Sequence, residues 1–297
     1  MKLNKIAASL GFAAALGLSA TTANAHVQFF FPQTNFEDDN IDFFIDNNGD
    51  GLIGVGDRLV SVFEITKTFG SGDESVFGPG DELTGIIDTI VTVAQPTGFG
   101  PTYFEFAYNP TGLFAGTPGA IAGAWYQAAG ADLNLITGSC LSLAECITQA
   151  TNGTNIFNVG FTGDPDEYFS LLGANDPDLV RAGDPNVSFT NGSYAFGIIE
   201  NNTGLEFGPI SCFPNSFSGA PLGKCNPAIT GGDGFAQLVG SGSILGGSDL
   251  PAGLVADGAF GRSDFDFGVR PLQVPEPGSL ALLGLALAGL SLVRRKS

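Results

Sequence analysis

The sequence contains a single histidine, His26, among 297 residues. One imidazole excludes zinc sites built from several histidines and the H-E-x-x-H motif of metalloproteases. It also excludes a copper brace, which needs a second histidine beside an amino-terminal one. A serine hydrolase triad would have to use His26 itself, which we expect to be the first residue of the mature chain (below). Because chain termini are usually mobile, we expect no such triad.

Positive charge is also scarce. The chain has 11 Lys and Arg residues against 30 Asp and Glu residues, for a net charge of −19. Between residues 26 and 274 there are six cations against 29 acidic residues, a formal charge of −23. Such a surface repels nucleic acid and anionic membranes, so we expect no nucleic-acid partner. It suits divalent cations and neutral or cationic polymers, and it equally suits plain solubility outside the cell.

Long apolar runs are confined to the two ends of the chain. At the N-terminus, Lys2 and Lys5 precede an apolar run over residues 6–18, and Ala23-Asn24-Ala25 follows with small residues on either side of Asn24. This order is typical of a secretory signal peptide. We therefore predict that residues 1–25 are removed between Ala25 and His26.

At the C-terminus, Val274-Pro275-Glu276-Pro277 precedes an uncharged run over residues 278–293, and Arg294, Arg295 and Lys296 follow it. Sixteen helical residues reach about 24 Å, short of a roughly 30 Å hydrocarbon core, so the run predicts a marginal transmembrane helix. The basic cluster should stay on the cytoplasmic side of the inner membrane, with the preceding chain across it. The alternative is a buried C-terminal helix, but core helices rarely end in three cations.

This C-terminal order resembles the PEP-CTERM sorting signal of exopolysaccharide-producing Gram-negative bacteria. The resemblance implies that residues 274–297 are recognised by a membrane-embedded exosortase and cleaved near Pro275-Glu276-Pro277. The whole chain is further similar to the flocculation-associated PEP-CTERM proteins of floc-forming bacteria, on residues 26–57 and Ser263-Asp264-Phe265-Asp266-Phe267. That similarity implies a role in floc or biofilm formation at the cell surface or in the extracellular matrix, in association with exopolysaccharide.

The region between the two ends reads as strands joined by turns. It holds most of the chain's 44 glycines and 26 phenylalanines, and Gly, Asn, Asp and Pro interrupt short apolar runs about every ten residues. We predict an all-β fold, a single jelly-roll-like β-sandwich over residues 26–273. One short helix is expected over residues 140–150, capped by Ser139 or by Ser142 with Glu145. The predicted strands cover residues 26–31, 59–69, 86–94, 103–108, 121–126, 156–161, 194–200, 205–210, 235–239 and 264–269, and residues 231–247 are interpreted as a loop region.

The four cysteines are Cys140, Cys146, Cys212 and Cys225. An even number in an exported chain favours disulfides. Three pairings are possible, and the spacings favour Cys140 with Cys146 and Cys212 with Cys225, each closing a short local loop. A metal site is the alternative, although C-x-x-C spacing is absent.

The sharpest internal motif runs from Asp46 to Asp57, with the sequence DNNGDGLIGVGD. Its oxygen-bearing side chains, Asp46, Asn48, Asp50 and Asp57, fall at positions 1, 3, 5 and 12 of an EF-hand-type loop. Leu52 would add its carbonyl, Gly51 allows the sharp turn, and Ile53 would anchor the loop to a core. The sequence therefore predicts a Ca²⁺ site, without the flanking helices of an EF-hand, and a plain Asn/Gly/Asp turn is the alternative.

Other candidate chemistry is weaker. Glu105 lies between aromatic residues and could serve a glycosidase, but an outward-facing acid on a strand explains it more simply. Trp125 could stack on a sugar, and a core role explains it better. We therefore expect a matrix protein that is not an enzyme. The alternative is an extracellular carbohydrate-binding or carbohydrate-active protein.

Overall fold

The computed structural model describes residues 27–70, 72–77, 80–98, 100–135, 138–182, 190–212 and 223–272. These residues form one compact unit dominated by antiparallel strands, which confirms the predicted all-β, sandwich-like fold. The predicted signal peptide, His26 and the sorting segment lie outside the described residues.

The strands are β1 (Thr34–Ile45), β2 (Arg58–Gly70), β3 (Asp73–Val76), β4 (Glu82–Pro96), β5 (Thr102–Tyr108), β6 (Ala120–Gln127), β7 (Thr154–Gly160), β8 (Tyr168–Gly173), β9 (Thr190–Asn201), β10 (Glu206–Gly208), β11 (Ile210–Ser211), β12 (Phe235–Ala236), β13 (Leu238–Gly246) and β14 (Ala259–Leu272). The helices are α2 (Leu143–Ala150), α3 (Pro177–Arg181), α4 (Pro227–Thr230) and α5 (Ala252–Ala256).

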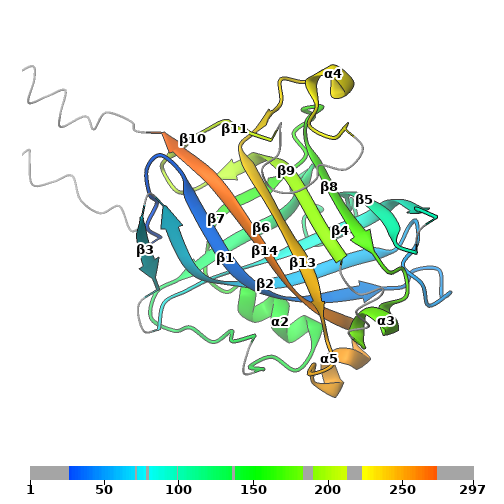
Figure 1. Ribbon diagram of the computed structural model, residues 1–297. Coiled ribbons are helices and arrows are strands. Elements are labelled where there is room, and N and C mark those ends of the chain that lie inside the picture. Colours follow the sequence, from blue (N-terminus) through cyan, green and yellow to red (C-terminus); the bar gives the residue numbers. More distant parts are fainter. Residues whose placement is uncertain are drawn as a thin grey trace, which may run out of the picture. The chain divides into compact units, whose positions relative to one another are not determined.

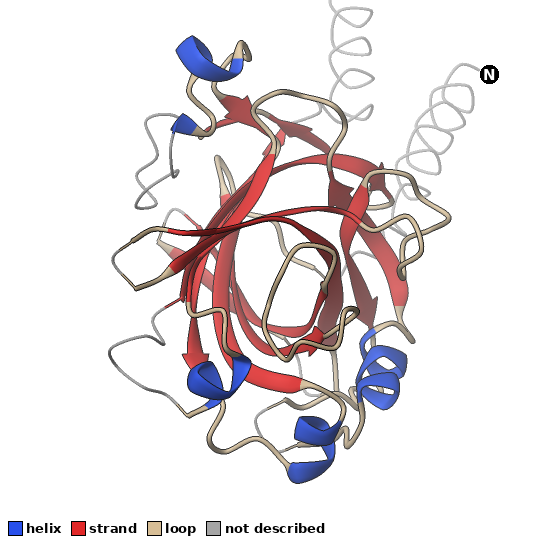
Figure 2. Cartoon of the chain, turned by 90° about the vertical axis from the view of Figure 1, so that its right-hand side faces the viewer, coloured by secondary structure: helices blue, strands red, loops and turns tan. Residues whose placement is uncertain are grey.

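The main sheet closes on itself. Its order is β3-β2-β1-β14-β13-β9-β7-β6-β4-β5-β8, and β2 also pairs with β4 while β9 pairs with β8. One edge of β4 pairs with β6 along its first half and with β5 along its second half. One edge of β9 is shared in the same way by β8 and β7. The pairs β6–β7 and β5–β8 therefore both connect β4 to β9. Neighbouring strands β1, β14 and β13 run side by side in Figure 1, and Figure 2 looks through the ring that the strands form.

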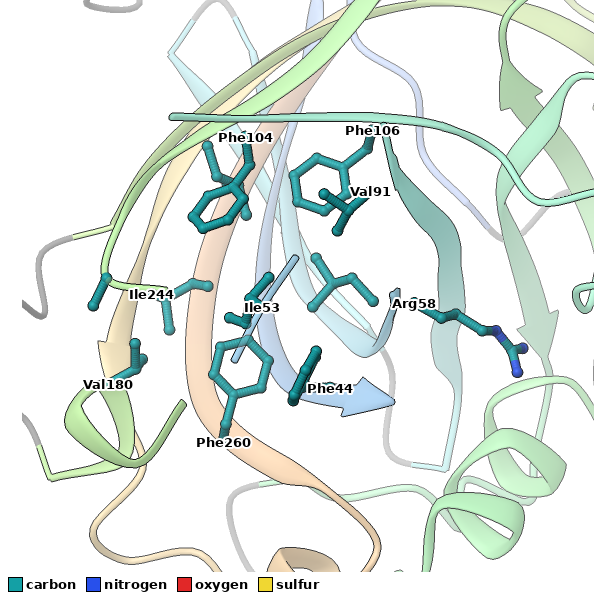
Figure 3. Close-up of a pocket in the computed structure, with 12 residues that line it drawn as sticks. Phe44, Ile53, Arg58, Val91, Phe104, Phe106, Val180, Ile244 and Phe260 are labelled. Carbon is teal, nitrogen blue, oxygen red and sulfur yellow. The ribbon is translucent and has the colours of Figure 1, made fainter. Parts of the chain in front are cut away.

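The space inside the closed sheet is filled mainly by aromatic side chains. Phe36 of β1 stacks on Phe267 of β14 with 4.6 Å between ring centroids, and Phe169 packs against Phe106, Tyr194, Phe196 and Phe265. The interior retains cavities of about 20 and 30 Å³ among the described residues. Each is about large enough for one water molecule, so this interior is a packed core. Figure 3 shows the smaller cavity, lined by Phe104, Phe106 and Phe260.

A second apolar layer covers part of the outer face of the sheet. Ile41 and Phe43 of β1 and Val60 and Val62 of β2 point outward and pack under α2 and the segment that precedes it. Ser142 caps α2, with its hydroxyl accepting a hydrogen bond from the Glu145 N–H, as predicted. This cover explains why β1 and β2 are apolar on both faces over these residues.

A third, smaller cluster lies under a two-stranded ribbon. Strands β11 and β12 pair with each other, and the cluster beneath them contains both Cys212 and Cys225. The disulfides join Cys140 to Cys146 and Cys212 to Cys225, which confirms the predicted pairing.

Two predictions about strands are wrong. The described part of the 26–31 segment is not a strand, since the first strand begins at Thr34, after a cis peptide bond between Phe31 and Pro32. The segment 231–247 is not a loop region, because β12 and β13 run through it. Within the described part of the chain, no helix is long and apolar enough to cross a membrane.

Candidate functional site

The predicted calcium loop joins two neighbouring strands. Residues 46–57 connect the end of β1 to the start of β2, and Ile45 and Arg58 face each other across the hairpin. The flanking elements are therefore strands, and the second of them is the strand predicted over residues 59–69. Gly49, Gly51 and Gly56 have positive φ angles, which the chain uses to turn three times within the loop.

The loop is shaped by its own side-chain oxygens. Asp46 Oδ1 accepts from the N–H groups of Asn48 (3.1 Å) and Gly49 (2.6 Å), and Asp46 Oδ2 accepts from Gly51 N–H (2.8 Å). Asn48 and Asp50 each accept from the N–H two residues later, at 2.8 Å. The hydrogen bond from Gly51 is the main reason that the pKa of Asp46 is lowered, so this group is a carboxylate at neutral pH.

The acidic side chains of the loop converge. Asp46, Asp50 and Asp57 each present a carboxylate oxygen within 4.8 Å of the others. The Leu52 carbonyl oxygen and the Asp57 carboxylate border the same space beside Gly54, where a Cβ would lie 3.9 Å from the former and 3.4 Å from Asp57 Oδ2, and the Asn48 side-chain amide lies beside it with its nitrogen at 3.8 Å. Carboxylate and carbonyl oxygens are the ligands that Ca²⁺ prefers, so the donor set fits this ion.

The loop is anchored to the body of the domain through Ile53 and Asp57. Ile53 packs against the main core and borders the cavity of Figure 3, as predicted, and its N–H donates to the Asn175 carbonyl (2.7 Å). Asp57 is fully buried and accepts from the N–H groups of Asn47 (2.9 Å) and Gly54 (2.8 Å). Its own carbonyl accepts from Val91 N–H of β4 at 2.8 Å. The last ligand position is thereby held rigidly.

A second acidic cluster, which the sequence analysis missed, lies where β1 meets β14. Asp38, Asp264 and Asp266 have carboxylate oxygens within 4.8 Å of one another. Asp38 is buried and accepts from Phe265 N–H (2.8 Å). Burial raises the pKa of all three groups, to about 6 for Asp266, so they bind protons more tightly than free carboxylates. The alternation of residues in β14 indicates from the sequence that Asp264 and Asp266 share one face. Asp38 could not be predicted as their neighbour, because the pairing of β1 with β14 brings it there.

Asp38 is also the first of a row of polar side chains inside the closed sheet. Asn40 and Asp42 follow it on β1, and in register they face Ser263 of β14 and Ser61 of β2. Burial raises the pKa of Asp42 to about 6, against the influence of the two serine hydroxyls. Asp42 Oδ2 nevertheless lacks a hydrogen-bond partner among the described residues. An unpaired oxygen in an apolar interior favours the protonated carboxyl.

The remaining candidates have structural partners. Glu105 accepts from the Tyr103 hydroxyl (2.9 Å) and pairs with Lys224 (3.1 Å) on the outer face of β5. Trp125 is half-buried and stacks on Phe114, with ring centroids 6.4 Å apart.

The comparisons with known proteins concern the C-terminus. Residues 273–296 match the family model of the PEP-CTERM protein-sorting motif, which includes Pro275-Glu276-Pro277 and the basic Arg294-Arg295-Lys296. No curated protein and no solved structure matches the chain. The motif implies export, transient anchoring of the C-terminus in the membrane and processing by an exosortase. The chain therefore carries a PEP-CTERM protein-sorting motif at its C-terminus.

Proposed function

We propose that the mature domain is a non-enzymatic matrix protein that supports floc or biofilm formation by associating with exopolysaccharide. The observation that carries this proposal is the sorting motif, which begins directly after β14 and implies delivery outside the cell. The strongly acidic composition, the two disulfides and the closed sheet support it, because they suit a stable domain in an oxidising, crowded surrounding. The engagement of Glu105 with Lys224 and Tyr103 favours a structural role for this acid.

The proposal includes Ca²⁺ at the 46–57 loop. The ion would be held by Asp46, Asn48, Asp50, Asp57 and the Leu52 carbonyl, and the convergence of three carboxylates supports this assignment. Because the loop lies between β1 and β2 and is tied to β4 through Val91, a bound ion would stabilise the hairpin. Ca²⁺ ions bound by both the acidic protein and an acidic glycan would also link the two.

The test combines a deletion with a binding measurement. Deleting the gene in the producing bacterium should reduce aggregation, and restoring the wild-type gene should recover it. The processed protein, purified from the producer, should be retained on the producer's own polysaccharide without releasing oligosaccharides. Unchanged aggregation after deletion would overturn the proposal, and released oligosaccharides would favour a carbohydrate-active enzyme instead.

A further inference from the structure

A polar groove with an exposed aromatic ring lies on the surface beside the β11–β12 ribbon. The groove has a volume of about 160 Å³. The ring belongs to Phe235 of β12, which is 42 % exposed, whereas most phenylalanines of the described region are buried in the core. Because this ring lines a polar groove, it offers a ligand an apolar face beside hydrogen-bonding groups. The lining consists of Thr162, Asp164, Glu167, Gly197, Pro209, Asp233, Phe235, Ala236 and Gln237.

One wall of the groove is held rigidly by buried polar contacts. Asp166 is fully buried and accepts hydrogen bonds from the Thr230 hydroxyl (2.6 Å) and from Gly234 N–H (2.6 Å). The Cys212 N–H donates to the Gly234 carbonyl (3.0 Å), and the disulfide links Cys212 to Cys225. These contacts fix the backbone on the N-terminal side of Phe235, so the ring is presented by a preorganised turn. Preorganisation lowers the entropic cost of binding.

The opposite wall is equally ordered. Glu167 accepts from both the N–H and the hydroxyl of Thr162, at 2.6 Å each. A Cβ on Gly197 would lie only 2.4 Å from Glu167 Oε1, so glycine at this position lets the wall form. The Gln237 side-chain oxygen accepts from Ile198 N–H (2.7 Å). The NH₂ group of the same amide points away from this contact and is a hydrogen-bond donor.

The charge of the lining selects the ligand. Asp164, Glu167 and Asp233 contribute three carboxylates, and the lining residues include no Lys or Arg. This set repels uronic acids, sulfated sugars and nucleic acid, and it offers hydrogen-bond acceptors to neutral hydroxyl groups. A sugar ring presents hydroxyls at its edge and an apolar C–H face, which matches carboxylates around an exposed phenyl ring.

We propose that this groove is a saccharide-binding site for a neutral hexopyranose unit of a polysaccharide chain, stacked on Phe235 and hydrogen-bonded by Asp164, Asp233 and Gln237. The proposal rests on the proposed function and names the site and the sugar class through which the domain would hold the matrix. The volume of about 160 Å³ suits a single sugar ring. Affinity for a long polymer then comes from many weak contacts made by many copies of the protein.

The test uses the mature, processed protein with defined probes. Neutral hexasaccharides of glucose, mannose and galactose are compared with an oligouronate by titration calorimetry. In buffer without free Ca²⁺, so that shared cations cannot link the probe to the protein, we expect at least one neutral probe to bind and the oligouronate not to bind. Phe235→Ala should weaken that binding at least tenfold, Phe235→Trp should retain it, and Asp233→Asn should weaken it severalfold. Leu245→Ala removes another exposed apolar side chain outside the groove and should change nothing.

The possible failures are distinguishable. If no neutral probe binds, or if Phe235→Ala binds like wild type, the groove is not the saccharide site. If Phe235→Ala is also still retained on the producer's polysaccharide, the matrix function stands and acts through another surface. If the wild-type protein itself is not retained on that polysaccharide, the proposed function fails as well. Amide exchange at Gly234 in each variant checks that the turn is intact, so that lost binding by an intact variant supports the proposal.

Discussion

Arg58 and Asp88 form a two-pronged ion pair across β2 and β4, with Nε–Oδ1 at 2.6 Å and Nη2–Oδ2 at 2.7 Å. The Asp88 side chain is 1 % exposed and also accepts from Leu113 N–H. Arg58 is the first residue after the 46–57 loop, and Figure 3 shows its guanidinium pointing away from the internal cavity. The pair therefore fastens the end of the loop to the strand whose pairing with β2 closes the sheet.

Removing one partner of this pair should destabilise the domain strongly. In Arg58→Ala, the Asp88 carboxylate, which is 1 % exposed, loses its counter-charge, and an uncompensated buried charge typically costs about 3–5 kcal/mol. Urea unfolding measures the loss. Asp178→Ala breaks the exposed pair with Arg181 and should cost less than about 1 kcal/mol. Equal losses in the two variants would contradict the importance of burial here.

If the 46–57 loop holds Ca²⁺ as proposed, the stability of the domain should depend on free Ca²⁺. At a concentration 100 times the dissociation constant, binding to the folded state alone adds about 2.7 kcal/mol to the free energy of unfolding. Thermal melts in chelator and in Ca²⁺ should differ for wild type and coincide for Asp50→Ala. Asp249→Ala, which removes an exposed acid outside the loop, serves as the control and should keep the shift. Coincident wild-type melts would rule out the site.

The buried Asp42 should make stability fall as pH rises. Its pKa is raised from the ordinary 3.8 to about 6, so between pH 4 and 6 the unfolded chain releases a proton that the folded protein retains. The resulting loss is about 3 kcal/mol above pH 6. Asp42→Asn removes this group, so the variant should match wild type near pH 4 and exceed its stability at pH 7.5. Denaturant titrations at both pH values decide this, with the exposed Glu206→Gln as control. Parallel pH profiles for wild type and Asp42→Asn would refute it.

The Cys212–Cys225 disulfide should mainly stabilise the β11–β12 ribbon. A loop of about 15 residues gains about 3 kcal/mol from cross-linking in the chain-entropy view. The double variant Cys212→Ser/Cys225→Ser should exchange the Gly234 amide hydrogen much faster, while the amides of β1 and β14 keep their protection. Hydrogen exchange followed by NMR measures both. Uniform loss of protection throughout the domain would show that the disulfide supports the whole fold instead.

Much of the strand content could be predicted because alternation is a local signal. Phe265, Phe267 and Val269 alternate against polar neighbours, and β14 contains them. In β2, Ser61 and Lys67 interrupt the apolar face of the strand. Ser61 lies inside, opposite Asp42, and Lys67 pairs with Glu37 beyond a bulge between Glu37 and Asp38. Such pairings depend on residues far away in the chain, and the closure of the sheet by β2 and β4 is equally non-local.

The candidate sites divide in the same way. The 46–57 loop could be found from sequence because its ligand positions are contiguous, and the structure brings Asp46, Asp50 and Asp57 together. The Phe235 groove could not be found, because its lining comes from segments separated by up to 75 positions, from Thr162 to Gln237. The short segment 233–237 gives no pattern beyond that of an ordinary strand.

The pairing of β1 with β14 joins the first and last strands of the domain, with Thr34 opposite Val269. A chain that emerges from its N-terminus cannot complete this contact until residue 269 has crossed the membrane, so folding must wait for almost the whole domain. Contacts this far apart in sequence also slow folding. Because the sorting motif begins at residue 273, immediately after β14, a chain held by its tail already has every strand on the outside. Tethering therefore provides time to fold before release, and a cut made before β14 has paired would free a molecule with an open sheet edge.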